Sequence, residues 1–386
     1  MEREMQKNYL LTPGPTPVPE SALLAMAQPI IHHRTPQFQA VLKEVEEDLR
    51  YVFQTKENVY IFASSGTGAM ETSVANLLSA EDKAIIVRGG KFGERFGEIC
   101  EAYNITCLYI DIPSCEAVSA YQIKELLNKN PGVKAVFTTL VETSTGVTNN
   151  IKEIASVVSS TDAVLVVDAI SGLCSVPFHM DEWKVDVVVA GSQKGLMIPP
   201  GLSFIALNQK AWKSVESSKS SRYYFDLRKA KEALDKTDTP FTPAVSLIIG
   251  LAEALKMIKS DGLENIWNRH ETMADAIRAA IAAMGLCLFP KQGASNAVTA
   301  VNVPAGIDGE KLVQTLRDRY GVGIAGGQEE LKGKIFRIAT MGYMTQWDVC
   351  VALCALEIVL IKMGYKMQAG VGLKAAEKVF IERADL

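Results

Sequence analysis

Lys194 stands directly after a strongly apolar stretch, in the segment DVVVAGSQKGLMIPPG that runs from Asp186 to Gly201. The β-branched and small apolar residues predict a buried strand, so this lysine lies where the strand leaves the core. A surface lysine in a loop is the ordinary interpretation. The alternative is a reactive amine, because ligands of α/β folds bind at the carboxyl ends of parallel strands. Burial and nearby cations would lower its pKa, and a neutral amine can act as a base and condense with an aldehyde.

A glycine-rich turn, SSGTGAMET, follows the apolar run VYIFA. A turn of this kind between a strand and a helix exposes backbone N–H groups that favour a phosphate. Its candidate donors are Ser65, Gly66 and Thr67. A dinucleotide fingerprint would need another glycine three residues after Gly68, where Glu71 stands instead. The turn therefore predicts a site for one phosphate, although glycine-rich turns without a ligand are also common.

Two further charged residues follow apolar segments or lie inside them. Asp168 closes the run AVLVVDAISG, where a carboxylate either caps a helix or pairs with a protonated ring nitrogen of a ligand. Arg337 lies in GKIFRIATMGY. It either points from a strand into solvent or binds a substrate carboxylate through its guanidinium fork.

Each of these signals is weak alone, but their order along the chain describes one ligand. The turn would hold a phosphate, Asp168 a pyridinium nitrogen and Lys194 an aldehyde, which are the three functional groups of pyridoxal 5'-phosphate. Arg337 would then bind the carboxylate of the substrate. The sequence therefore predicts a site for this cofactor.

The elements that must position these residues are seven short apolar runs between about residues 59 and 207. They are NVYIFAS, KAIIVRG, TCLYIDI, KAVFTTL, AVLVVDA, VDVVVAG and LSFIALN. Helical patterns such as GAMETSVANLLS, YQIKELLNKN and IKEIASVVSS separate several of them. Continuous apolar strands that alternate with helices predict an α/β fold, with a mostly parallel seven-stranded sheet covered on both faces.

The chain of 386 residues is too long for one ordinary core. We expect an extended, proline-punctuated arm over residues 1–20, a large cofactor-binding domain over 21–262 and a small C-terminal α+β domain over 263–386. A long helix around residues 244–284 is predicted to link the two domains. The strands AVTAVNVP and GKIFRIAT, the helix GEKLVQTLRDRYG and a final helix WDVCVALCALEIVLIKMG would form the small domain.

The composition of the chain limits the kinds of binding partner that we expect. The net charge of −4 gives no reason to expect nucleic acid or an anionic membrane surface. The sequence has no long apolar run that would span a membrane and no signal-peptide pattern. Its seven cysteines form no C-x-x-C pair and its four histidines have no metal-ligand spacing, so we expect a reducing, cytoplasmic setting and no metal.

Over nearly its whole length, the chain resembles the class V, fold-type I aminotransferases of the alanine–glyoxylate and serine–pyruvate branch. LTPGPTPVP resembles the N-terminal segment of that family, SSGTGAME its phosphate loop, and ETSTG a motif that contacts the cofactor. VDAISGL is similar to the aspartate motif, and GSQKGLMIPPG to the highly specific lysine motif. The resemblance implies a pyridoxal-phosphate-dependent transaminase.

The resemblance also implies roles by position. Lys194 takes the place of the lysine that binds the cofactor aldehyde and moves the substrate α-proton. Gln193 matches a residue that contacts the phosphate, and Asp168 matches the partner of the pyridine nitrogen. Arg337 corresponds to the arginine that binds the substrate carboxylate.

Other positions follow from the same comparison. Phe92 stands where an aromatic ring stacks on the cofactor, many relatives having tryptophan there, and Thr143 where a hydroxyl lies beside the ring. As alternatives, Phe92 would be core filler and Thr143 a turn former. Thr242 corresponds to a threonine that reaches the phosphate of a neighbouring subunit, which implies a homodimer with shared active sites. Thr239 stands where some relatives have tyrosine, and Gly14 lies in an arm that closes over the substrate.

We expect ping-pong transfer of an amino group from a small amino acid, alanine or serine, to glyoxylate or pyruvate. A dicarboxylic donor such as aspartate would need a second cation, for which Arg34 in HHRTP is the candidate, although a salt bridge is its ordinary role. A cysteine desulfurase would have a cysteine shortly before Arg337, and YGVGIAGGQEELKGKIFR has none. A lyase on the same scaffold is an alternative. A nucleotide-binding protein would leave Lys194, Asp168 and Arg337 without a role.

Overall fold

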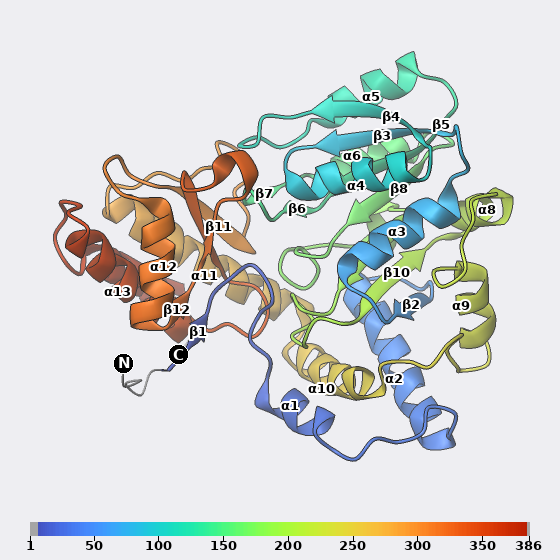
Figure 1. The fold of residues 1–386 in the computed structure, drawn as a ribbon, viewed down its shortest axis with the longest axis horizontal. Coiled ribbons are helices and arrows are strands. Elements are labelled where there is room, and N and C mark those ends of the chain that lie inside the picture. Colours follow the sequence, from blue (N-terminus) through green and yellow to red (C-terminus); the bar gives the residue numbers. More distant parts are fainter. Residues whose placement is uncertain (1–6, 384–386) are drawn as a thin grey trace.

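The computed structural model describes residues 7–383. Its main element is a seven-stranded sheet with the strand order β2-β10-β9-β8-β5-β3-β4. The strands are β2 (Val59–Phe62), β3 (Lys83–Arg88), β4 (Thr106–Asp111), β5 (Val133–Thr139), β8 (Val164–Asp168), β9 (Val187–Gly191) and β10 (Ser203–Leu207). Only β10 runs antiparallel to its neighbours β2 and β9 within this sheet. The predicted α/β fold with a mostly parallel seven-stranded sheet is confirmed (Figure 1).

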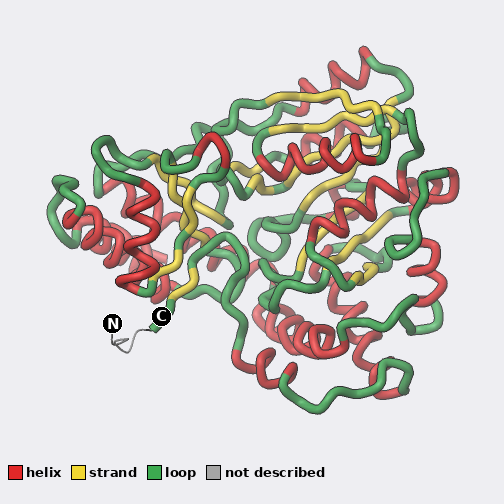
Figure 2. Tube along the Cα trace, viewed as in Figure 1, coloured by secondary structure: helices red, strands yellow, loops and turns green. Residues whose placement is uncertain are grey.

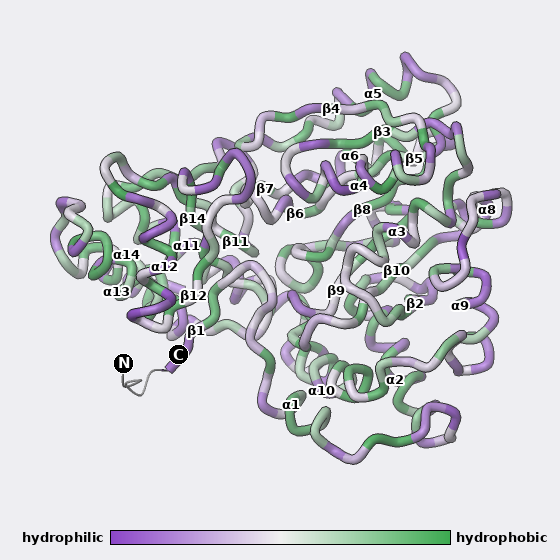
Figure 3. Tube along the Cα trace, in the orientation of Figure 1, coloured by the Kyte–Doolittle hydropathy of each residue, from purple (hydrophilic) through white to green (hydrophobic). Residues whose placement is uncertain are grey.

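Helices cover both faces of this sheet, as Figure 2 shows. Alternate strand residues belong to two separate hydrophobic clusters, with Ile85, Val136, Leu165 and Val188 in one and Ile86, Phe137, Val166 and Val189 in the other. The first cluster includes α2 (Pro36–Phe53), α5 (Ala120–Lys129), α6 (Ile151–Val158) and α10 (Val245–Asp261). The second includes α3 (Gly66–Leu77), α4 (Lys91–Ala102), α8 (Gln209–Ser217) and α9 (Leu227–Leu234). Hydrophilic colours prevail along α8 and α9 at the outer side of the sheet (Figure 3).

Local sequence signals set where these helices begin. α2 starts with Pro36 after Thr35, whose side chain accepts a hydrogen bond from Phe38 N at 3.4 Å. A proline at the first helical position and a threonine cap are both favourable there. The residues of α2 that are buried, Phe38, Leu42, Val45, Leu49, Val52 and others, recur at helical spacing, so one face of the helix packs on the sheet.

A smaller sheet with the order β11-β14-β13 lies beside the large one. It contains β11 (Val298–Asn302), β13 (Ala325–Gly326) and β14 (Ile335–Ala339), all antiparallel. It is accompanied by α11 (Leu263–Ala283), α12 (Gly309–Tyr320) and α13 (Gln346–Lys362). The strand and helix predictions for this part of the chain are confirmed, except that α13 is not the final helix. α14 (Val371–Arg383) follows it and packs mainly against α11; its fully buried residues are Gly372 and Ala376, and Val371, Val379 and Phe380 pack partly buried against the core.

The single long helix predicted around residues 244–284 is wrong. Two helices, α10 and α11, occupy the segment and are separated by Gly262. This glycine has φ +83° and ψ 140°, a conformation outside the helical region that residues with a side chain rarely adopt. The predicted division of the chain between residues 262 and 263 falls at this break and stays a prediction.

The N-terminal segment is extended over its described residues, as its prolines predicted. A short strand β1 (Tyr9–Leu10) pairs in parallel with β12 (Val322–Gly323) beside the smaller sheet (Figure 1). The chain then passes to the large sheet, where Thr16 N donates to Gln193 O at 3.0 Å, and it enters α1 (Glu20–Met26). The segment therefore bridges the two sheets. No helix within residues 7–383 is long and apolar enough to cross a membrane.

Candidate active site

The carboxyl ends of five parallel strands bring the candidate residues to one edge of the large sheet. The Ser65–Thr67 turn follows β2, Phe92 follows β3, Thr143 follows β5, Asp168 ends β8, and Gln193 and Lys194 follow β9. Residues far apart in the sequence therefore meet because the strands run in the same direction. This edge is where α/β sheets bind ligands.

Lys194 is buried, with 7% of its surface exposed. Burial lowers the pKa of its amine to about 8, and the positive charges of Arg337 and Arg95 act in the same direction, while Asp168 opposes them. The amine donates a hydrogen bond to Pro13 O in the N-terminal segment. The next residue, Gly14, has φ +123°, and a Cβ there would lie 2.4 Å from Lys194 Cε. The segment thus covers the lysine, and only glycine fits at position 14.

Asp168 is 4% exposed and is the last residue of β8. Its Oδ1 accepts a hydrogen bond from Ile170 N at 2.8 Å. Burial raises the pKa of this carboxyl to about 7. The proximity of Glu142 also raises it, whereas Lys194 and Arg95 lower it. A buried carboxylate with so few donors would be stabilised by a cationic N–H group of a ligand.

The N-terminus of α3 forms the phosphate candidate. Ser65 is its N-cap and its side chain makes no capping hydrogen bond, so the first N–H groups of the helix are suited to an anion. Nearby, the buried Oε1 of Gln193 has no hydrogen-bond partner among the described residues. A Cβ at Gly66 would come within 2.6 Å of Ile170, which keeps the turn close to the segment that follows Asp168.

Arg337 lies at the centre of the smaller sheet, between Ala300 of β11 and Ala325 of β13. It is buried, and this burial lowers the pKa of its guanidinium to about 10. Its Nε and Nη2 donate to Gly326 O at 3.0 and 2.7 Å, and its Nη1 donates to Thr143 O at 2.7 Å. Because each Nη carries two hydrogens, one on each remains for a carboxylate.

Phe92 and Thr143 reach the site from the two neighbouring strand ends. Phe92 lies in the first turn of α4, and the Arg95 guanidinium lies 4.8 Å from the centre of its ring. The Thr143 hydroxyl is 2.5 Å from the Ser171 hydroxyl. Phe92 is only partly buried, and Thr143 lies in the turn after β6, where its carbonyl accepts a hydrogen bond from Arg337.

Thr239 and Thr242 lie beside the carboxyl end of β2, where they line a small pocket together with Ala63 and Leu202. Both belong to the loop before α10, where Thr242 is exposed and the Thr239 hydroxyl donates to Phe241 O at 2.8 Å. Arg34 lies beside the same loop. It is largely exposed and forms a salt bridge with Asp238 at 3.1 Å, the ordinary role that its sequence context suggested.

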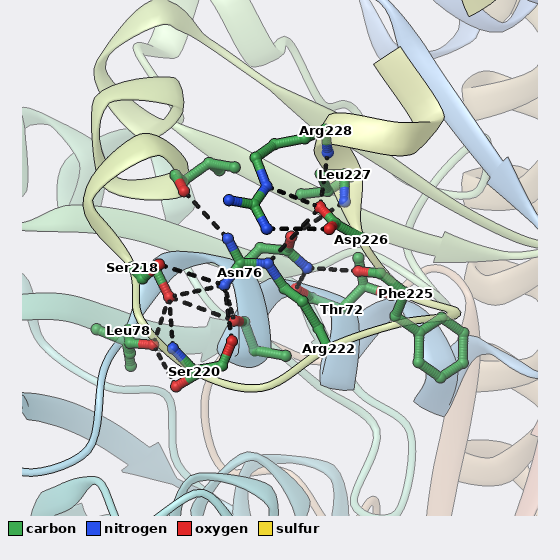
Figure 4. A network of polar contacts seen from close by, with 12 residues as sticks. Thr72, Asn76, Leu78, Ser218, Ser220, Arg222, Phe225, Asp226, Leu227 and Arg228 are labelled. Atoms are coloured by element: carbon green, nitrogen blue, oxygen red, sulfur yellow. Dashed lines mark hydrogen bonds and ion pairs between the residues drawn. The ribbon is translucent and has the colours of Figure 1, made fainter. Parts of the chain in front are cut away.

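A polar network holds the neighbouring loop, residues 218–226, against α3 (Figure 4). The side chain of Arg222 is buried and donates to Ser220 O at 3.0 Å and Ala75 O at 3.2 Å. Asn76 of α3 donates to Phe225 O at 2.6 Å. Tyr224, next to Phe225, stacks on Phe241 with ring centres 5.1 Å apart. The loop with Thr239 and Thr242 is therefore anchored to the helix that carries the phosphate turn.

Sequence reasoning missed Arg95 and Glu142. Arg95 donates to the hydroxyl of Thr67 at 3.3 Å and is close enough to affect the pKa of Asp168 and Lys194. Its position one helical turn after Phe92 was the signal that could have found it, because residues three apart share a helix face. Glu142, in the motif ETSTG, is almost completely buried.

A groove of about 900 Å³ lies elsewhere, at the amino ends of the strands, and is lined by residues such as Asp82, Lys134, Asp162 and Lys210. The carboxyl edge collects the buried lysine, aspartate and arginine with shifted pKa values, which are typical of an active site. The chemistry therefore belongs to the carboxyl edge.

The residues present fit pyridoxal phosphate. An open helix N-terminus suits its phosphate, a buried and underpaired Asp168 suits its pyridinium, and a buried amine with a lowered pKa suits its aldehyde. Together with the fold, this site defines a fold-type I enzyme of the pyridoxal phosphate class. The aminotransferase class-V family model matches residues 8–350, and the chain belongs to this family of aminotransferases. Family membership implies the cofactor.

Curated relatives match over almost their full length. The chain is 41% identical to the soluble hydrogenase small subunit of Synechococcus sp. over 97% of this chain and 98% of that protein. It is 35% identical to the L-aspartate–glyoxylate aminotransferase of Paracoccus denitrificans, with 96% of each chain covered. It is 34% identical to the serine–glyoxylate aminotransferase of Methylorubrum extorquens, with 98% of each covered.

A solved structure of a related enzyme has the same fold. The ureidoglycine–glyoxylate aminotransferase of Bacillus subtilis superposes with a TM-score of 0.94 at 30% sequence identity, covering 99% of this chain and 100% of that one. These two transaminases and this solved structure share glyoxylate in their names but differ in the amino donor.

Proposed function

We propose that this protein is a pyridoxal-phosphate-dependent transaminase that moves an amino group from alanine or serine to glyoxylate or pyruvate. The observation that carries the proposal is the buried Lys194 with its lowered pKa, at the same sheet edge as Asp168 and close enough to Arg337 for the charge of Arg337 to act on the amine. The glyoxylate-linked names of the relatives support the acceptor. The desulfurase alternative is not favoured, because the segment before Arg337 contains no cysteine.

When bound, pyridoxal phosphate supplies an electron sink that stabilises negative charge at the α-carbon of an amino acid. The Ser65–Thr67 turn and Gln193 would hold its phosphate, and Asp168 would hold a proton on the ring nitrogen. Arg337 would orient the substrate carboxylate. Lys194 Nζ would then accept the α-proton of the substrate, since a pKa near 8 suits an amine that must be neutral. Pro13 and Gly14 would exclude water from above the amine.

The preference for small donors follows from the cations near the site. A second carboxylate on the donor would need a cation of its own, because an unpaired buried charge costs several kcal/mol. Arg34 is exposed and paired with Asp238. Arg95 is bonded to Thr67 in the phosphate turn, so its side chain is directed to the phosphate end of the site.

We expect alanine or serine to exceed aspartate and glutamate at least tenfold in kcat/KM with glyoxylate as acceptor, roughly 1.4 kcal/mol in transition-state binding. Steady-state kinetics with the four donors measures this preference. A tenfold advantage for a dicarboxylate would contradict it.

Arg95 is the observation that favours a second candidate, an aspartate–glyoxylate transaminase, since this cation of α4 is close enough to affect the pKa of both Asp168 and Lys194. The variant Arg95→Gln separates the two. If Arg95 binds a distal carboxylate, kcat/KM falls for aspartate and stays unchanged for alanine. If it serves the phosphate end, both donors lose activity in parallel.

We also propose a homodimer with shared active sites, because Thr242 is exposed in the loop before α10 and corresponds to a threonine that reaches a neighbouring subunit in the family that the chain resembles. The exposed Thr242 would contact the cofactor phosphate of the partner subunit. We therefore expect sedimentation velocity to give a dimer and specific activity to fall when the enzyme is diluted below its dissociation constant. A monomer with full activity at every dilution would exclude a shared site.

A further inference from the structure

Glu142 is a buried carboxylate for which the proposed mechanism has no use. It is the second residue of β6 (Val141–Glu142) and 2% of its surface is exposed. Its Oε2 accepts hydrogen bonds from Phe92 N and Gly93 N, both at 3.1 Å. Its Oε1 accepts from Ser144 N at 3.1 Å and from Ser144 Oγ at 2.5 Å. Four donors from two separate segments therefore converge on one side chain.

One of these segments is the start of α4. The N-cap of this helix is Gly90, which has no side chain to accept a hydrogen bond, so the first N–H groups of the helix need another acceptor. Glu142 supplies it from a different part of the chain, and its negative charge suits a helix N-terminus. A Cβ at Gly90 would lie 2.7 Å from Glu142 Cγ and 2.4 Å from Ser144 Oγ. The glycine thus makes room for the carboxylate.

The other segment is the turn between β6 and β7 (Val147–Thr148), which also leads to the site. Thr143 lies between Glu142 and Ser144 in the chain. The hydrogen bonds that the Glu142 carboxylate accepts from Ser144 fix the position of Thr143. Its carbonyl accepts the hydrogen bond from Arg337 Nη1 at 2.7 Å, and its hydroxyl contacts Ser171. The Glu142 carboxylate is therefore bonded on one side to the backbone of Phe92 and on the other to Ser144, the residue after the one whose carbonyl holds Arg337.

We propose that Glu142 is a positioning residue that fixes Phe92 against the cofactor ring and, through Thr143, fixes Arg337 against the substrate carboxylate. This inference rests on the proposed function, because it takes Phe92 and Arg337 as contacts of cofactor and substrate. It predicts that loss of the carboxylate weakens the binding of cofactor and of substrate together. The two effects would come from Phe92 and Arg337, which are far apart in the sequence.

The chain contains a matched control. Glu357 of α13 is also buried, with 4% exposed, and accepts hydrogen bonds from Gly370 N at 2.7 Å, Gly372 N at 2.6 Å and Leu373 N at 3.3 Å. It thus caps the start of α14, on the far side of the smaller sheet. Glu357→Gln disturbs the same kind of interaction as Glu142→Gln, and both are expected to lower stability.

For Glu142→Gln we expect the dissociation constant of pyridoxal phosphate and the KM of the amino donor each to rise about tenfold, since an amide cannot accept on both sides. Glu357→Gln should leave both values within about twofold of wild type. In the cofactor-free protein, hydrogen exchange at the Phe92 and Gly93 amides should quicken in Glu142→Gln alone. Equal binding constants and equal exchange in the two variants would overturn the proposal.

Ser144→Ala keeps the carboxylate and removes one donor, so it tests the proposal even if Glu142→Gln does not fold. The cofactor dissociation constant and the donor KM should rise in the same direction by about two- to threefold; unchanged values would overturn the proposal. The exchange measurement needs neither cofactor nor substrate. If wild-type protein proves to lack transaminase activity, the proposed function fails while the role of Glu142 in holding α4 is still measured.

Discussion

Replacing Lys194 by alanine is expected to lower transamination by at least about 10³-fold, because it removes both the amine that would bind the cofactor aldehyde and the base that would move the α-proton. Borohydride should no longer link the cofactor covalently to the chain. Binding of pyridoxal phosphate should survive in part, since the Ser65–Thr67 turn and Asp168 are unchanged. Mass spectrometry after reduction and a transamination assay measure the two effects.

Lys210 offers the control for this variant. It is a partly buried lysine at the other edge of the sheet, where it donates to Ala163 O at 2.5 Å and pairs with Asp186 at 3.3 Å. Lys210→Ala should lower stability and leave turnover per folded molecule unchanged. Normal turnover in Lys194→Ala, or loss of the covalent link in Lys210→Ala, would remove Lys194 from its assigned role.

The large sheet could be predicted from sequence because its strands are buried on both faces and read as continuous apolar runs. The same pattern predicted that Asp168 and Lys194 lie at one edge of the sheet, since both residues come at the ends of such apolar runs. Family resemblance then supplied roles for Gln193, Phe92 and Thr143 that their residue types alone do not indicate.

What the sequence did not reveal depends on contacts between distant segments. Arg95 and Glu142 are ordinary surface residue types. Only the meeting of α4 with α3 makes Arg95 a neighbour of Thr67, and only the meeting of α4 with the β6–β7 turn makes Glu142 a cap for Phe92. The break at Gly262 was missed because a single glycine between two helical patterns does not reveal its φ angle. α14 was missed because its fully buried residues are Gly372 and Ala376, while Val371, Val379 and Phe380 are only partly buried against the core.

Asp168→Asn is expected to slow exchange of the substrate α-proton by about 10²-fold or more while changing the donor KM little. The carboxylate would hold a proton on the ring nitrogen through its opposite charge, and an amide of the same shape has no charge to do so. The effect belongs to the transition state, since negative charge reaches the ring only as the proton leaves. Exchange of the α-proton of alanine in D₂O, followed by NMR, measures this step without an acceptor.

Asp186→Asn is the matched control for this variant, because Asp186 is an equally buried carboxylate at the amino edge of the sheet, where it accepts from Leu165 N at 2.8 Å. It should lower stability without affecting exchange per folded molecule. If the two asparagine variants exchange the α-proton at the same rate, the mutation at Asp168 acts only through the fold, and its pairing with the ring nitrogen is wrong.

The same carboxyl group predicts a pH dependence of cofactor binding. Burial raises the pKa of Asp168 to about 7 in the cofactor-free protein, so below this pH the group is mostly neutral and has no charge to offer a protonated ring nitrogen. The affinity of wild-type protein for pyridoxal phosphate should therefore fall as the pH decreases from about 8 to 6. The asparagine side chain in Asp168→Asn does not titrate. The affinity of this variant for pyridoxal phosphate should therefore follow only the ionisation of the phosphate and of Lys194. Fluorescence titrations of both proteins across this range compare the two profiles, and parallel curves would show that Asp168 does not bind the ring as a carboxylate.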